Sequence, residues 1–306
     1  MNKILDFLKS ENINPDMITG IEEFRNKYPV EESGLARVPS PAYMYYGNDV
    51  WEKAVTALLS GENLLLVGPK ATGKNVLAEN LACVFGRPAW DISFYLNIDA
   101  SSLIGTDTFR NGEVSFRRGP ITRCAEEGGF GILDEINMAK NESLAVLHAA
   151  LDFRRIIDVP GYDRIVLSPC TRFIATMNYG YAGTREVNEA LASRFMVIDM
   201  PVISGENLKK LLLAEHPDLK EEAAEQLSML FSEIRGKCES GEISTKALDL
   251  RGLTAAVKLV RKGLNLGQAL EIGIVNKCFD IFEKQLISDL ISARVDSAAT
   301  AAGLFS

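Results

Sequence analysis

GPKATGKN, residues Gly68–Asn75, directly follows the apolar run LLLV at residues 64–67. A short apolar run that ends at a glycine and precedes an amphipathic segment predicts a buried strand, a tight loop and a helix. The backbone N–H groups of such a loop, together with the positive end of the helix, surround a polyphosphate. A lysine placed like Lys74 reaches the outer phosphates. We therefore expect a phosphate-binding loop made of Gly68, Pro69, Lys70, Ala71, Thr72, Gly73, Lys74 and Asn75.

The last residue of this loop departs from the usual pattern. GxxxxGK is normally followed by Ser or Thr, whose hydroxyl binds Mg²⁺, and here Asn75 follows. An asparagine carbonyl oxygen is an acceptable Mg²⁺ ligand, but it stands on a longer side chain with a bulkier planar head. We expect Asn75 to bind the metal with altered geometry. An ordinary glycine turn between strand and helix is the alternative, and the lysine and the following helix argue against it.

The composition is that of an ordinary globular protein. The chain has 306 residues, of which 47% are hydrophobic and 24% charged, a length that suits two domains or one large domain with a lid. Its net charge of −8 argues against a protein whose main partner is nucleic acid, but it does not exclude a local basic patch. No run of 18 apolar residues occurs and the N-terminus lacks the features of a signal peptide, so we expect a cytoplasmic protein without a membrane partner.

Cysteine and histidine patterns give little support for a metal centre or a catalytic triad. The five cysteines are scattered, and no CxxC pair occurs, so we expect reduced and mostly buried thiols. The only histidines are His148 and His216, and neither lies near a cysteine in the sequence. We expect structural roles for both.

Two further apolar runs have polar residues at their carboxyl ends. FGILDEIN, at 130–137, ends in Asp134 and Glu135, and TRFIATMN, at 171–178, ends in Asn178. In an open α/β sheet that edge is where ligands bind. An aspartate there can hold Mg²⁺, a glutamate can polarise an attacking water, and an amide can orient that water against a terminal phosphate. Acids in a turn and an asparagine at a strand end are also common without a function, but the loop upstream favours a functional interpretation.

The order of elements changes near residues 201–205. Before that point, strands at 64–67, 88–97, 130–137, 171–178 and 196–200 alternate with helices such as those at 48–59, 141–151 and 186–192, and hairpins are predicted around Asn111-Gly112 and Pro160-Gly161. After it, segments 208–213, 221–234, 250–260 and 266–290 are all helical in period, and the tail from Ala298 is expected to fray. We expect a helical extension at 1–45, an α/β nucleotide-binding domain with a parallel sheet at 46–202, and an all-helical lid domain at 203–306.

Taken in order, the motifs GPKATGKN, LDEIN, ATMN and ASRF, with two hairpins and a helical tail, resemble the AAA+ ATPases. The runs LIGTDTFRNGEVSFRRGP and GGFGILDEINMA resemble the MoxR-like and dynein-related members of that superfamily. The resemblance covers about residues 46–290 and implies a P-loop AAA+ core with two β-hairpin insertions that face the pore of a ring or its partners.

The resemblance also implies roles for individual residues and for cofactors. ATP and Mg²⁺ are the expected ligands, with Lys74 at the β and γ phosphates and Asp134 at the metal. Glu135 is the expected water-activating residue and Asn178 the first sensor. Arg194 resembles an arginine finger, although alone it is better explained as a surface salt bridge. Arg251 resembles the second sensor, but its context LDLRG departs from the expected STR, and STK at 244–246 offers an alternative.

Three functions remain open at this stage. The first is a slow ATPase that assembles as a homo-oligomeric ring and remodels a protein client. In the family the ring is a hexamer, and many members work beside a partner with a von Willebrand factor A domain. The second is a nucleotide-dependent scaffold in which Asn75 makes hydrolysis negligible. The third is a DNA-directed motor that uses the arginines near the hairpins, namely Arg110, Arg117, Arg118, Arg154 and Arg155; the acidic overall charge makes it the least favoured. Nothing in the sequence identifies the client or the ring size.

Overall fold

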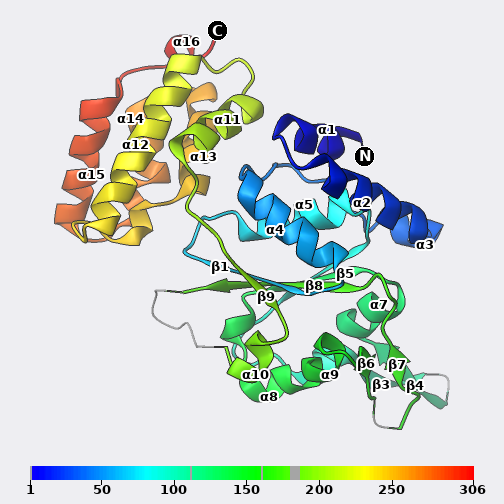
Figure 1. The fold of residues 1–306 in the computed structure, drawn as a ribbon. Helices are drawn as coiled ribbons and strands as arrows, with labels where there is room; N and C mark the ends of the chain where they lie inside the picture. Colours follow the sequence, from blue (N-terminus) through cyan, green and yellow to red (C-terminus); the bar gives the residue numbers. More distant parts are fainter. Residues whose placement is uncertain (1, 111, 160, 180–186) are drawn as a thin grey trace. The chain divides into compact units, whose positions relative to one another are not determined.

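The computed structural model describes residues 2–110, 112–159, 161–179 and 187–306, and the chain divides into two compact units, Met1–Pro201 and Val202–Ser306 (Figure 1). In the first unit, apolar runs form a five-stranded sheet in the order β2-β5-β8-β1-β9, with every neighbouring pair parallel. The strands are β1 (Leu64–Gly68), β2 (Ala89–Ser93), β5 (Phe130–Asp134), β8 (Arg172–Asn178) and β9 (Met196–Asp199). The predicted parallel sheet is therefore confirmed.

The register of the sheet brings the ends of its central strands together. Gly68, the last residue of β1, pairs with Asn178, the last residue of β8. On the other side of β8, Leu133 of β5 pairs with Ala175, so that Asp134 follows at the same edge. The glycine loop and both predicted polar strand ends therefore lie at one edge of the sheet, where α/β proteins bind ligands.

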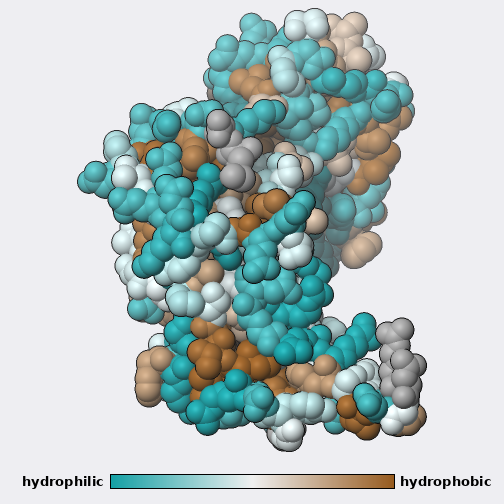
Figure 2. All heavy atoms as spheres, turned by 90° about the vertical axis from the view of Figure 1, so that its right-hand side faces the viewer, coloured by the Kyte–Doolittle hydropathy of each residue, from teal (hydrophilic) through white to brown (hydrophobic). Residues whose placement is uncertain are grey.

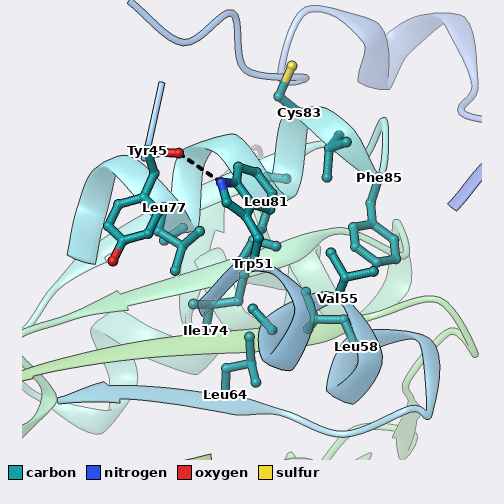
Figure 3. Packing of buried hydrophobic residues seen from close by; sticks show 14 of the residues in the cluster. Tyr45, Trp51, Val55, Leu58, Leu64, Leu77, Leu81, Cys83, Phe85 and Ile174 are labelled. Carbon is teal, nitrogen blue, oxygen red and sulfur yellow. Dashed lines mark hydrogen bonds between the residues drawn. The ribbon is translucent and has the colours of Figure 1, made fainter. Parts of the chain in front are cut away.

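Helices cover both faces of this sheet (Figure 1). On one face lie α4 (Asn48–Leu59) and α5 (Lys74–Val84), together with helices α1 (Asn2–Ser10) and α2 (Pro15–Lys27), while α3 (Glu32–Leu35) follows in the chain. Trp51 and Leu58 of α4 are fully buried against β1 and α5, and the Trp51 indole N–H donates to the carbonyl of Tyr45 at 2.8 Å (Figure 3). Leu8 and Ile21 are fully buried in the same core, so the N-terminal helices share it with the five-stranded sheet.

A second core covers the other face, built by α6 (Ala100–Ile104), α7 (Pro120–Glu126) and the residues around 141–151. We predicted one helix over residues 141–151. It is instead broken into α8 (Asn141–Leu144), the 3₁₀ turn η2 (Ala145–Leu147) and α9 (His148–Leu151), and a further 3₁₀ turn, η1 (Ile136–Met138), follows β5. The predicted helix at 186–192 is α10 (Glu189–Ala192), whose N-cap is Asn188; Glu186 lies outside the described residues.

Both predicted hairpins are present. Strand β3 (Gly105–Arg110) pairs antiparallel with β4 (Glu113–Arg118), and β6 (Ile156–Ile157) with β7 (Ile165–Val166). The predicted turn residues Asn111 and Pro160 lie outside the described residues. Tyr162 joins the two insertions, because its hydroxyl donates to Asp107 at 2.6 Å and its ring packs on Phe116 with centroids 5.0 Å apart. Figure 2 shows hydrophobic side chains at the surface of the lower part of this unit, and the exposed residues of the hairpins include Phe109, Val114 and Val166.

The second unit is helical, as predicted. It contains α11 (Gly205–Glu215), α12 (Glu221–Glu239), η3 (Thr245–Ala247), α13 (Leu250–Arg261), α14 (Leu266–Gly273), η4 (Val275–Lys277), α15 (Ile281–Arg294) and α16 (Ala301–Leu304). The prediction of one helix over 266–290 was wrong. Asp280 accepts from the N–H groups of Phe282 and Glu283 and starts a new helix at residue 281, and α14 has ended by Gly273. No helix among the described residues is both long and apolar enough to cross a membrane.

The expectation of a frayed tail was also wrong. Leu304 is 3% exposed, its carbonyl accepts from the N–H of Lys220 at 2.9 Å, and the N–H of Ser306 donates to Asp218 at 2.9 Å. The ring of Phe305 lies under the guanidinium of Arg261, 4.4 Å from it. These contacts fix the tail to the segment between α11 and α12, some 80 residues earlier in the chain, and to the last residue of α13.

All five cysteines are free in the structure, and four of them are buried, in agreement with the expectation of mostly buried thiols.

Candidate functional site

The loop between β1 and α5 has the backbone that a phosphate-binding loop needs. A Cβ at Gly68 would lie 2.8 Å from the carbonyl oxygen of Met200, so only glycine fits there. Gly73 is the N-cap of α5 and has a φ of 80°, and Ala71 has a φ of 63°. These left-handed residues turn the chain sharply into the helix. The N–H groups of the first turn of α5 have no partner within the helix, and the helix dipole adds positive charge there.

Lys74, the first residue of α5, is folded back over this loop. Its side chain is buried, and its ammonium donates to the carbonyls of Gly68 at 3.0 Å and Pro69 at 2.7 Å and to the Thr72 hydroxyl at 3.1 Å. These three acceptors are neutral. Burial lowers the pKa of Lys74 to about 8, and the nearby carboxylates of Asp134 and Glu135 offset only part of that effect. At pH 7 the loop therefore holds a cation that a phosphate group would stabilise.

The two predicted acids stand side by side at the end of β5, and Thr176 of β8 contacts both. The Thr176 hydroxyl donates to Asp134 Oδ1 at 2.7 Å and accepts from the N–H of Glu135 at 3.0 Å. Glu135 has a left-handed backbone, with φ 53° and ψ 47°. For a residue other than glycine that conformation costs about 1 kcal/mol or more, and it is typical of functional sites.

Asn178 lies beside this acid pair, as the parallel register requires. Its side-chain amide donates to Glu135 Oε1 at 2.8 Å, and its carbonyl accepts from the side chain of Asn137 at 3.0 Å. The structure therefore brings together the predicted residues Lys74, Asp134, Glu135 and Asn178.

Asn75 is less closely engaged. It follows Lys74 in the first turn of α5 and its side chain is exposed. No hydrogen bond joins Asn75 to Asp134 or Glu135 among the described residues. Of the rest of the loop, Lys70 is exposed, and Thr72 is buried and donates to the carbonyl of Pro69 at 3.1 Å.

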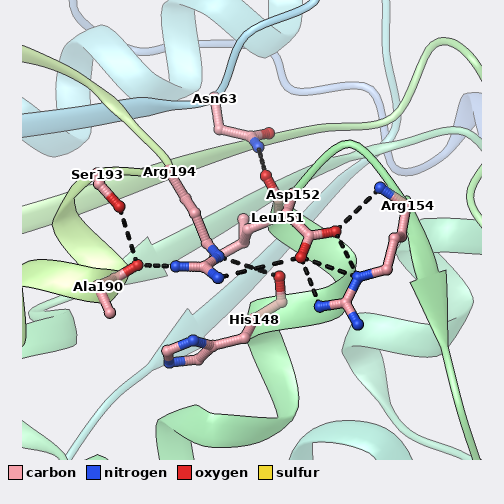
Figure 4. Close-up of polar contacts among 8 residues, drawn as sticks. All are labelled: Asn63, His148, Leu151, Asp152, Arg154, Ala190, Ser193 and Arg194. Atoms are coloured by element: carbon pink, nitrogen blue, oxygen red, sulfur yellow. Dashed lines mark hydrogen bonds and ion pairs between the residues drawn. The ribbon is translucent and has the colours of Figure 1, made fainter.

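Arg194 is directed into its own unit (Figure 4). Its Nε donates to the carbonyl of His148 at 3.3 Å, Nη1 contacts the carbonyl of Ala190, and Nη2 lies 4.0 Å from Asp152. Arg154 pairs with the same carboxylate more closely, at 2.6 Å. The structure thus shows Arg194 in local polar contacts, as the salt-bridge alternative expected, and the finger role stays a prediction.

The two candidates for a second sensor belong to the second unit, and neither role is tested by their surroundings there. Arg251 is exposed on the first turn of α13, where Asp249 caps the helix by accepting from the N–H of Gly252 at 3.1 Å. Lys246, of the alternative STK motif, lies over the ring of Phe279 at 5.4 Å.

Sequence reasoning missed Thr176. The signal was present, because Thr176 and Asn178 are two residues apart on β8 and therefore share a face. Only the lateral register, which sets Thr176 beside the end of β5, shows that its hydroxyl reaches both acids.

The donor set fits a magnesium-bound polyphosphate. The loop offers backbone N–H groups and a buried ammonium, and Asp134 offers the hard carboxylate oxygen that Mg²⁺ prefers. No group of three or more His, Cys, Asp or Glu side chains comes together in the described part of the chain. One carboxylate next to a phosphate site matches the usual way of binding Mg²⁺, in which substrate phosphates supply other ligands.

Comparison with known proteins agrees with this geometry. A family model described as "AAA domain (dynein-related subfamily)" matches residues 63–195, which include the loop, both acids, Asn178 and Arg194. The "Uncharacterized protein YojN" of Bacillus subtilis (strain 168) is 35% identical over 242 residues, covering 78% of this chain and 79% of the relative. The "Uncharacterized protein SERP0979" of Staphylococcus epidermidis is 34% identical over 249 residues, with coverages of 79% and 94%.

Proposed function

Because this chain belongs to the dynein-related subfamily of the AAA domain family, we propose that it binds ATP in the loop Gly68–Asn75 and hydrolyses it with Mg²⁺. The observation that carries the proposal is the hydrogen-bonded group at the edge of the sheet. There the Thr176 hydroxyl bonds to Asp134 and to the N–H of Glu135, and the Asn178 amide bonds directly to the Glu135 carboxylate, all at 2.7 to 3.0 Å. The negative charge of both acids also acts on Lys74 of the loop.

Each residue of this group has a task in the proposed reaction. The loop N–H groups and Lys74 bind the β and γ phosphates. Glu135 accepts a proton from water as the water oxygen bonds to the γ-phosphorus, the bond to the β–γ bridging oxygen breaks, and ADP and phosphate result. Asn178 orients the water or the γ-phosphate. Mg²⁺, which Asp134 and Asn75 would hold, neutralises charge on the phosphate oxygens when bound.

A substitution in the loop tests the binding step. We expect Lys74→Met to weaken binding of a fluorescent ATP analogue by at least about tenfold, since the buried ammonium is lost. Lys53→Met is the matched control, because it removes the same charge from an exposed position of α4, outside the loop. Equal affinity of wild type and Lys74→Met would contradict the proposed site, whereas binding weakened only by Lys74→Met supports it.

The finer function is proposed on the resemblance to MoxR-like proteins. In this proposal the chain assembles as a homo-oligomeric ring, Arg194 completes the site of a neighbouring copy, Arg251 acts as second sensor, and ATP turnover remodels a protein client. The exposed apolar residues of the hairpins support a protein partner, because exposed aromatic and aliphatic surface suits protein contacts.

A nucleotide-dependent scaffold is the second candidate, and Asn75 is the observation that favours it. The side chain lacks the hydroxyl normally found at this position. The two candidates differ in turnover: the scaffold binds ATP and releases no phosphate above the rate of a Glu135 variant.

A DNA-directed motor has less support. Arg118 is paired with Glu126 at 2.5 Å and Arg154 with Asp152 at 2.6 Å, and Arg155 donates to the carbonyls of Ser168 and Thr171. Three of the five arginines that this function would use are therefore engaged within the chain, which reduces the positive charge that they could offer to phosphates. Binding of duplex DNA that weakens steeply with salt would revive this function.

A further inference from the structure

Thr176 occupies the centre of the hydrogen-bonded group without a role in the proposed reaction. It is 1% exposed and lies on β8, between β5 and β1. Its backbone pairs with Leu66 of β1, while its hydroxyl extends to the end of β5. One hydroxyl thus connects the central strand to both acids of its neighbour.

The two hydrogen bonds of Thr176 have different effects. A hydroxyl donates once, and that donor is directed at Asp134 Oδ1, where it fixes the orientation of the carboxylate. The same oxygen accepts from the N–H of Glu135, whose backbone has the unfavourable left-handed conformation. The acceptor therefore stabilises the turn that directs the Glu135 side chain to Asn178, two residues further along β8.

We propose that Thr176 is a positioning residue for the metal-binding and water-activating acids. It orients Asp134 toward Mg²⁺ and holds the peptide of Glu135 so that its carboxylate meets Asn178. The proposal rests on the proposed ATPase function, since it assigns the residue that arranges the acids of that same site. Thr176 touches neither substrate nor metal in this role.

The competing explanation is that the hydroxyl only satisfies buried polar groups. Both explanations predict that Thr176→Val destabilises the fold, because the N–H of Glu135 loses its acceptor. They differ in the dependence on Mg²⁺. A positioning role predicts a weaker response of nucleotide binding to Mg²⁺, whereas a purely structural role leaves that response unchanged once the protein is folded.

The chain offers a matched control at the other end of the same strand. Thr171 immediately precedes β8, is fully buried, and donates to the carbonyl of Ala125 at 3.1 Å. It lies about 16 Å along the strand from Thr176, at about 3.3 Å per residue. Thr171→Val therefore removes a buried hydroxyl next to the start of β8 without touching Asp134 or Glu135.

The experiment measures binding of a fluorescent ATP analogue to wild type, Thr176→Val, Thr176→Ser and Thr171→Val, first in EDTA and then during a Mg²⁺ titration. For Thr176→Val we expect affinity in EDTA within about twofold of wild type and a Mg²⁺ midpoint raised about tenfold, as for a lost hydrogen bond to a charged group. Thr176→Ser restores the midpoint because it keeps the hydroxyl, and Thr171→Val leaves it unchanged. In turnover assays Thr176→Val lowers kcat with little change in KM.

A Thr176→Val midpoint equal to that of wild type would overturn the proposal, and so would an equal shift in Thr171→Val. If Thr176→Val does not fold, Thr176→Ala and Thr176→Ser take its place. A Mg²⁺ midpoint that is raised in Thr176→Ala and equal to wild type in Thr176→Ser supports the positioning role, and midpoints equal to wild type in both variants overturn it. Failure of the ATPase proposal has a separate signature, because wild type itself then either binds no nucleotide or releases no phosphate above the rate of Glu135→Gln.

Discussion

The side-chain amide of Asn178 donates a hydrogen bond of 2.8 Å to the carboxylate of Glu135. These are the two residues proposed to act on the water and on the γ-phosphate. In this arrangement an amide N–H of Asn178 and one carboxylate oxygen of Glu135 are bonded to each other. Both groups therefore give up this hydrogen bond when they bind the water or the γ-phosphate. The pair is therefore coupled, and its members are expected to work as a unit.

Asn178→Ala tests this coupling. We expect it to slow phosphate release about 100-fold, the scale for losing one directed donor, while ATP affinity changes by less than about threefold. The double variant with Glu135→Gln is expected to be no slower than the slower single variant, as for residues that act together. If the fold-reduction in rate of the double variant equals the product of the fold-reductions of the two single variants, the residues act independently.

The lowered pKa of Lys74 predicts a pH dependence of stability. Its pKa is about 8 in the folded chain and 10.5 ordinarily, so between these values the unfolded chain holds a proton that the folded chain has lost. Stability from this group therefore rises with pH across that window, by about 3 kcal/mol in total. Urea unfolding of wild type and Lys74→Met at pH 7.5, 8.5 and 9.5 measures this change in the free energy of unfolding. The increase with pH is expected in wild type and is absent from Lys74→Met, which lacks the titrating amine. Unfolding free energies of wild type and Lys74→Met that change with pH in the same way would contradict the prediction.

Asn75 offers a prediction about the metal. Asn75→Thr restores the usual hydroxyl, and we expect a Mg²⁺ midpoint about threefold lower or a comparable gain in turnover. The position is exposed on the first turn of α5, so the substitution is expected to leave the unfolding free energy within about 0.5 kcal/mol of wild type. An unchanged magnesium titration would show that this side chain does not bind the ion.

Arg194 is predicted to act on a neighbouring copy. Wild-type turnover per chain is then expected to rise with protein concentration, and Arg194→Ala to remove that rise and slow assembled protein about 1000-fold. Arg154→Ala is the control, because Arg154 shares the Asp152 carboxylate with Arg194. A concentration dependence that survives in Arg194→Ala, or is lost equally in Arg154→Ala, would contradict the finger role.

Local sequence was sufficient to predict the elements that carry the site. The strands that carry the site, β1, β5 and β8, are largely apolar runs, and the loop, the acids and Asn178 lie at their ends. The carboxyl ends of parallel strands share an edge, which is why Asp134 and Asn178 could be expected near Lys74.

Features that depend on distant residues could not be predicted in the same way. The contacts of Thr176 arise from the pairing of β8 with β5, which are about 40 residues apart in sequence. The tail is ordered by Asp218 and Lys220, which no local pattern at 298–306 reveals. The break at residue 281 was readable in principle, because Asp280 is a good N-cap, but the continuous apolar period across 266–290 concealed it.

Phosphate release by wild type and Glu135→Gln, measured with ATP and Mg²⁺ on samples whose ATP affinity is determined in parallel, tests the central claim most directly. We expect Glu135→Gln to bind ATP as tightly as wild type and to release phosphate at least about 100-fold more slowly. Equal rates of phosphate release, with ATP bound equally well, would contradict an ATPase that uses Glu135 and would leave the nucleotide-dependent scaffold as the function.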